Sequence, residues 1–152
     1  MKNTKGGFSL VEVLLVSGFT VVVIAGLIQL FVYCNKLAAA AGNMSFAMAE
    51  AQSKMEEMRN TNFASVLTDY SPSGTPGNTF SLTNLTGKGV IYIDSSSSDI
   101  YTVQITVCWR EYDGRIVGED GDLDGALGVS EDTDGNGKIS SPVTLLSMIA
   151  RK

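Results

Sequence analysis

The sequence predicts an α+β fold in which one long N-terminal helix packs on a small antiparallel sheet. Residues 13–33 form an uncharged and mostly apolar run, and residues 35–59 are rich in Ala, Met, Glu and Lys, which are good helix formers. Residues 101–110 alternate apolar and polar side chains with the period of a half-buried strand. An amphipathic helix needs an apolar surface to cover, and such a strand face supplies one.

The apolar run at residues 13–33 is long enough to cross a membrane. It has 21 residues and its only strongly polar side chain is Gln29. As a helix it would measure roughly 30 Å, the thickness of the hydrocarbon core of a bilayer. Lys2 and Lys5 precede it, so the positive-inside rule places the N-terminus in the cytoplasm and the rest of the chain outside. A secretory signal peptide has a shorter apolar region that is followed by small residues, so a retained anchor fits better.

The helix is expected to continue past the anchor, from about Phe8 to about Asn60. Its second half carries one apolar stripe at spacings of four and three residues, which indicates an amphipathic helix packed against a core. Gly42 and Asn43 are a weak point in this pattern, and two helices with a bend near Gly42 are the alternative. The stripe consists of Met44, Met48, Ala51, Met55 and Met58.

A loop is expected between the helix and the sheet, over residues 61–89. Residues 71–78 consist of Ser, Pro, Gly, Thr and Asn, which are turn and loop formers. One short strand is expected inside this segment, near residues 80–82.

The sheet is expected to occupy residues 90–152. Its first long strands are 90–94 and 101–110, and an Asp-Gly turn at Asp113 returns the chain through residues 115–117. The apolar run 143–149 supplies the last strand.

The N-terminal residues resemble a known family. Lys5-Gly6-Gly7 followed by Phe8-Ser9-Leu10-Val11-Glu12-Val13-Leu14-Leu15 is similar to the class III signal of type IV prepilins and of the pseudopilins of type II secretion. The resemblance implies that a prepilin peptidase cuts between Gly7 and Phe8 and then methylates the new N-terminal amine of Phe8. Glu12 becomes the fifth residue of the mature chain, where the family has its glutamate.

The same resemblance implies a domain organisation and a fold. Residues 1–7 would be the leader, residues 8–34 the half of the helix that spans the membrane and later the fibre core, and residues 35–152 a periplasmic or extracellular pilin head. Residues 35–60 would be the amphipathic helix half of that head. Many major pilins carry a proline midway through the apolar helix, whereas this chain has Gly26 and Gln29 in that region.

Within the family the chain most resembles PilV-type minor pilins and I-type pseudopilins. The Val-Glu-Val-Leu sequence at 11–14 and the strand 107–110, followed by a glycine-containing hairpin and by residues 141–145, carry that likeness. We expect a minor pilin for the assembly or initiation of a type IV pilus, with a type II secretion pseudopilin at the pseudopilus tip as the alternative. The implied partners are other pilins, the prepilin peptidase, the inner-membrane assembly machinery and, before assembly, membrane lipid.

Glu12 places a carboxylate beside the apolar run. A lone carboxylate in hydrocarbon either takes up a proton or finds a partner. In the family the glutamate is thought to pair with the N-terminal amine of a neighbouring subunit, which here is the amine of Phe8. The alternative is a glutamate at the membrane surface that is solvated by lipid headgroups.

A second candidate site lies in an acidic segment near the C-terminus. Seven of the sixteen acidic residues fall between Glu119 and Asp134, with no Lys or Arg among them. Two stretches match the start of an EF-hand loop, and the first has a glutamate at its twelfth position whereas the second has Val143 there. Calcium suits these oxygen ligands, and the alternative is a solvated, flexible acidic loop. The expected ligands are Asp120, Asp122, Asp124, Glu131, Asp132, Asp134 and Asn136.

Other functional classes find little support in the sequence. The chain has no histidine, no nucleophile in an activating setting and no glycine-rich phosphate loop, so we expect no enzyme and no cofactor other than calcium. A net charge of −5 without a basic stripe disfavours nucleic acid as a partner. Cys34 and Cys108 either pair outside the cytoplasm or are simply small apolar residues. A membrane-anchored adhesin is a further, less favoured, alternative.

Overall fold

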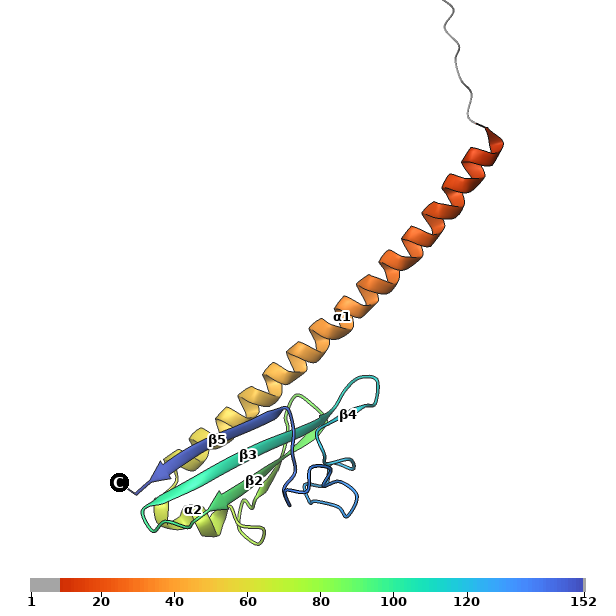
Figure 1. Cartoon of the computed structure of the whole chain (residues 1–152). Coiled ribbons are helices and arrows are strands. Elements are labelled where there is room, and N and C mark those ends of the chain that lie inside the picture. Colours follow the sequence, from red (N-terminus) through yellow and green to blue (C-terminus); the bar gives the residue numbers. More distant parts are fainter. Residues whose placement is uncertain (1–8, 152) are drawn as a thin grey trace, which may run out of the picture. The chain divides into compact units, whose positions relative to one another are not determined.

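The computed structural model describes residues 9–151, and it has an α+β fold. The chain divides into two compact units, one ending at Ala39 and the other beginning at Ala40. Helix α1 is continuous through both units, because it runs without interruption from Leu10 to Asn60 (Figure 1). The expected start at Phe8 lies outside the described residues, and the alternative of a break near Gly42 is not seen.

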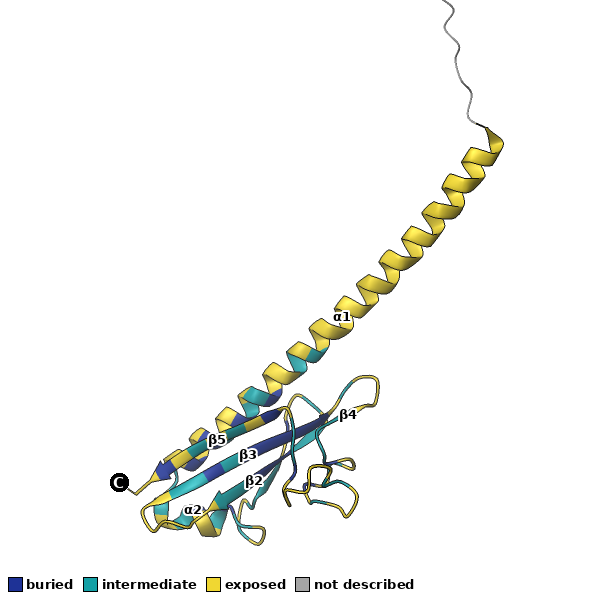
Figure 2. Ribbon diagram, viewed as in Figure 1, coloured by how far each residue is buried: buried dark blue, intermediate teal, exposed yellow. Residues whose placement is uncertain are grey.

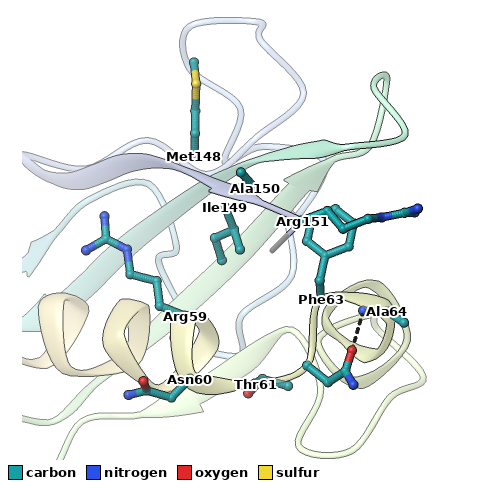
Figure 3. A pocket seen from close by; sticks show the side chains of 10 residues that line it. Arg59, Asn60, Thr61, Phe63, Ala64, Met148, Ile149, Ala150 and Arg151 are labelled. Carbon is teal, nitrogen blue, oxygen red and sulfur yellow. Dashed lines mark hydrogen bonds between the residues drawn. The ribbon is translucent and has the colours of Figure 1, made fainter.

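The first unit consists of the apolar half of α1. Its large apolar side chains, from Leu10 to Leu37, are exposed to the surroundings (Figure 2). This part of α1 is long and apolar enough to cross a membrane, a property that membrane anchors share with signal sequences. It therefore presents an exposed apolar surface, which is typical of segments that contact lipid or other protein.

The second unit is built around an antiparallel sheet of five strands. These are β1 (Thr79–Ser81), β2 (Gly87–Asp94), β3 (Ile100–Arg110), β4 (Ile116–Val117) and β5 (Val143–Ala150). The order is β1-β2-β3-β4, and β5 also pairs with β3, next to β4 along the same edge. The four predicted strand runs and the hairpin return are thereby confirmed, with β2 beginning three residues earlier than expected.

The main core lies between the second half of α1 and one face of the sheet. Ala51, Met55 and Met58 of the predicted stripe are buried there, together with Ala47, whereas Met48 is partly buried. The sheet contributes alternate residues of β3, which the period of two predicted: Val103, Ile105, Val107 and Trp109.

Met44 departs from the expected stripe, because its side chain is 43% exposed. One residue before it, Asn43 donates a hydrogen bond to Glu111 (2.6 Å), and Glu111 comes directly after the end of β3. The sheet therefore ends at this level of the helix, and Met44 has no strand to pack against. The spacing that predicted the stripe was right, but the sheet is shorter than the helix.

The segment 61–89, expected as a loop with one short strand, also contains a helix. Helix α2 runs from Phe63 to Asp69, and the side chain of Asn62 caps it by accepting a hydrogen bond from the Ala64 N–H (3.0 Å). The Phe63 ring stacks on Tyr101 at 4.2 Å between centroids. The local cap and the tertiary stacking contact stabilise a helix that is too short to be recognised from periodicity.

The outer face of the sheet carries a smaller apolar cluster. Val90 and Cys108 lie there under Ile139, which comes from the long connection between β4 and β5. Cys108 is buried and Cys34 is exposed, and both are free thiols. Cys108 thus takes the second of the two roles considered for it, that of a small buried apolar residue.

Candidate functional site

The first candidate site is the start of α1. Glu12 lies in the first turn of the helix with an exposed side chain, and its N–H donates to the carbonyl oxygen of Ser9 at 3.0 Å. Gly7 and Phe8, the residues of the expected cleavage site, lie outside the described residues. A carboxylate in the first turn interacts favourably with the partial positive charge of a helix N-terminus.

Glu12 differs from the other polar residues of this helix half. The hydroxyl of Ser17 donates to the Leu14 carbonyl at 2.9 Å, and that of Thr20 donates to the Val16 carbonyl at 2.7 Å. Their polar groups are therefore satisfied within the helix, which makes them compatible with an apolar environment. Glu12 is the only charged residue between positions 9 and 35, and no side chain of its own helix pairs with it.

The second candidate site is the connection between β4 and β5, residues 118–142. It contains two loops with the same hydrogen bonding. In the first loop the carboxylate of Asp120 accepts from the N–H groups of Asp124 (3.1 Å) and Gly125 (3.0 Å). In the second, Asp132 accepts from the N–H groups of Asn136 (3.0 Å) and Gly137 (3.1 Å). Each aspartate therefore holds its own loop in a tight turn.

The glycine at the sixth position of each loop is required by the backbone. Gly125 has φ +84° and Gly137 has φ +71°, in the left-handed region that disfavours other residues. The turn brings the alternate side chains of each loop toward one point. The sequence predicted this glycine from the EF-hand pattern.

The acidic side chains gather in two groups. Asp120, Asp122 and Asp124 form the first, and carboxylate oxygens from all three lie within 4.8 Å of one another. Asp132 and Asp134 form the second together with Glu119, which was not among the expected ligands.

The remaining two expected ligands, Asn136 and Glu131, differ in their contacts. The amide of Asn136 donates to Asp134 at 2.7 Å and to the Ser140 hydroxyl at 2.9 Å. Glu131 is not a member of either group, and its carboxylate accepts hydrogen bonds from the backbone of the first loop instead.

Glu131 and Glu119 hold equivalent places in the two loops. Glu131 accepts from the N–H groups at positions two and nine of the first loop, Gly121 (2.8 Å) and Gly128 (2.7 Å). Glu119 accepts from the N–H groups at positions two and nine of the second loop, Thr133 (3.0 Å) and Ser140 (2.9 Å). Glu119 therefore does for the second loop what the glutamate at position twelve does for the first.

A sequence signal for Glu119 does exist. Glu-Asp-x-Asp at 119–122 recurs as Glu-Asp-x-Asp at 131–134, and the glycines at 125 and 137 keep the same interval. The segment is thus a tandem repeat of twelve residues, in which each loop is preceded by a glutamate. Comparison with the EF-hand pattern counts forward from each aspartate and misses the residue before it.

Asp120 is the most unusual carboxylate of the segment because it is fully buried. Burial raises the pKa of its carboxyl above the ordinary value, although the N–H groups of Gly125 and Asp124 oppose that shift. Among residues 9–151 the ion pairs involve Lys54, Arg59 and Arg151, so none of them neutralises this segment.

The donor set fits a hard divalent cation. Calcium binds oxygen at about 2.3–2.6 Å, so two oxygens on one ion lie at most about 5 Å apart. The oxygens of each acidic group meet that limit. Each group could therefore hold a cation, which would also relieve the repulsion among its carboxylates.

Comparisons of this chain with protein-family models, with curated proteins and with solved structures find no match. The fold and the two sites define a small α+β protein with one long apolar helix and a pair of acidic loops. Its function has to be inferred from these residues.

Proposed function

We propose that this protein is a minor pilin, a structural subunit for the assembly or initiation of a type IV pilus. In this proposal a prepilin peptidase cleaves between Gly7 and Phe8, and the amine of Phe8 is methylated. The chain first sits in the inner membrane with its N-terminus in the cytoplasm and its head outside, and it then enters the fibre with other pilins. The observation that carries the proposal is Glu12, a lone carboxylate in the first turn of an uncharged apolar helix.

Two features of the molecule support this proposal. The exposed apolar half of α1 is a surface for lipid before assembly and for neighbouring helices afterwards. The head is a small antiparallel sheet on the amphipathic half of the same helix, which agrees with the helix, loop and sheet order of the pilin family.

Glu12 has a defined role in this proposal. Removal of the leader creates an α-amino group on Phe8, four residues away from Glu12 in the chain. Out of water a pair between this amine and the Glu12 carboxylate of a neighbour is strong, and either group left alone is penalised. The pair forms only at one stagger between two helices, so it favours a single register along the fibre.

The test is the substitution Glu12→Ala, followed through processing, membrane insertion and fibre formation. We expect the variant to be cleaved and inserted normally but to be absent from sheared pili in immunoblots. Gln29→Ala, which removes the other strongly polar side chain of the apolar run, is the control and should enter pili. Normal incorporation of the Glu12 variant would sink the proposal.

A type II secretion pseudopilin is the alternative from the same family, and a membrane-anchored adhesin is the less favoured one. The chemistry of the N-terminus does not separate pilin from pseudopilin. Electron microscopy of a deletion strain that is complemented with a tagged chain does, because loss of surface fibres supports the pilus. Loss of protein secretion with intact fibres would support the pseudopilus.

We further propose that calcium orders the acidic loops of the head. The supporting observation is the pair of carboxylate groups with oxygens within 4.8 Å, in a segment where no lysine or arginine forms an ion pair. Outside the cytoplasm calcium is abundant, and loops of this kind bind it with dissociation constants of about 10⁻⁴–10⁻³ M.

Calcium at 10 mM should stabilise the full chain by about 1.4–2.7 kcal/mol for one such site, which raises the melting temperature by several degrees. A chelator should reverse the shift. Asp122→Asn should reduce it, whereas Asp113→Asn, in the turn before β4, should leave it intact. An unchanged melting temperature in calcium would favour a solvated acidic segment without a cation.

A further inference from the structure

The acidic segment contains a reciprocal arrangement. Glu119, which precedes the first loop, accepts hydrogen bonds from the second loop at Thr133 and Ser140 (3.0 and 2.9 Å). Glu131, which precedes the second loop, accepts from the first loop at Gly121 and Gly128 (2.8 and 2.7 Å). The glutamate that accepts hydrogen bonds from one loop is therefore the neighbour, in the chain, of the first aspartate of the other loop.

The backbone of these loops makes few hydrogen bonds of its own. Residues 118–142 contain no helix and no strand, so the backbone of the segment has no regular ladder of hydrogen bonds. One backbone bond joins the start of the first loop to the second, from the Glu119 N–H to the Ser140 carbonyl (2.9 Å). Side-chain carboxylates therefore accept many of the backbone N–H groups in the segment.

Both loops also rest on the same apolar cluster. Ile139 of the second loop is fully buried against Val90 and Cys108 on the outer face of the sheet, and its N–H donates to the Tyr92 hydroxyl at 2.9 Å. Leu123 and Leu127 of the first loop pack against that cluster. Displacement of one loop would uncover apolar surface that the other loop shares.

We propose that the two acidic loops order and open as one cooperative unit, locked by Glu119 and Glu131. If Glu131 releases the first loop, it also frees the start of the second, because Asp132 is the next residue. If Glu119 releases the second loop, it also frees the start of the first, because Asp120 is the next residue. A local change in either loop is then transmitted to the other, so that the two loops form a single unit of local unfolding.

This inference deepens the proposed calcium role but is independent of the pilus. The lock between the loops does not need a cation. A ligand that binds one loop would, through the lock, change the order of both. Its failure would leave the calcium proposal standing with two independent loops. Failure of the calcium proposal would leave the lock intact.

The experiment is amide hydrogen exchange, read by mass spectrometry on the full chain in detergent micelles with a chelator present. Glu131→Ala should speed exchange about tenfold or more in the first loop, where it removes charge-assisted hydrogen bonds. The proposal predicts a comparable increase in the second loop, at Thr133 and Ser140. Glu119→Ala should likewise speed exchange at Gly121 and Gly128.

Two controls make the result decisive. Asp113→Asn removes an acid whose carboxylate, among residues 9–151, accepts only from the Arg115 N–H (3.1 Å), and it should leave both loops protected. Exchange in β3 should stay slow in all variants, which shows that the head remains folded. Faster exchange confined to the loop that each glutamate contacts would overturn the proposal.

Discussion

At the scale of single residues, the two glycines at position six differ in their surroundings. A Cβ on Gly125 would lie 2.8 Å from Cγ2 of Thr79 in β1, whereas a Cβ on Gly137 would meet nothing within 4 Å. Both residues have a left-handed backbone, which costs a non-glycine residue about 1–2 kcal/mol.

We therefore expect Gly137→Ala to lower the free energy of unfolding by about 1–2 kcal/mol and Gly125→Ala to lower it by about 1–3 kcal/mol more, the cost of a forced contact. Denaturant unfolding of both variants measures the difference. Equal losses would mean that Thr79 moves aside without cost.

At the scale of elements, Glu57 joins the two helices of the head. Its carboxylate accepts from the Tyr70 hydroxyl at the end of α2 (2.9 Å) and from Lys54 (2.6 Å). The hydrogen bond from Lys54 lowers the pKa of Glu57, the hydrogen bond from Tyr70 lowers it further, and partial burial opposes both. A carboxyl with a lowered folded-state pKa adds stability above its unfolded pKa and loses it as the pH falls through the folded value.

Glu57→Gln should therefore lower the free energy of unfolding by up to about 1 kcal/mol at pH 7, because the side chain is 48% exposed and solvent screens its ion pair. The loss should be smaller at about pH 3, because the stability that the carboxylate adds declines as the pH falls from the unfolded pKa through the lower folded value. Denaturant unfolding at the two pH values checks this. Tyr70→Phe is the control, since it removes the hydroxyl and leaves the pair with Lys54.

Long periodic elements could be predicted from the sequence, and short or non-local features could not. The period of two in β3 and the stripe from Met48 to Met58 reflect burial against a single face, which sequence spacing records directly. Helix α2 depends on a cap at Asn62 and on the stacking of Phe63 against Tyr101, 38 residues later in the chain.

The acidic site was predicted only in part for a related reason. The EF-hand pattern lists ligands within one loop, and it therefore found Asp120 to Asp124 and the two aspartates of the second loop. The role of Glu119 arises between loops, because it contacts residues 14 and 21 positions away. Contacts between residues so far apart in the sequence depend on how the head packs.

At the scale of the whole molecule, the core and the apolar helix half are separate in the sequence. Every buried residue of the main core lies at Ala47 or later, and among residues 9–151 the earliest side-chain hydrogen bond to the sheet region is that from Asn43 to Glu111. The apolar half of α1 contributes no residue to that core among residues 9–151. The stability of the head should therefore not depend on it.

A chain that begins at Ala40 should accordingly be soluble without detergent and unfold cooperatively, with a melting temperature within about 3 °C of the full chain in micelles. A chain that begins at Ala51 is the matched control, because it also loses Asn43, the buried Ala47 and the partly buried Met48. It should be less stable by about 2–4 kcal/mol. Calorimetry of both chains tests whether the head is stable without the apolar half of α1. A chain from Ala40 that fails to fold would show that the apolar half contributes to the stability of the head.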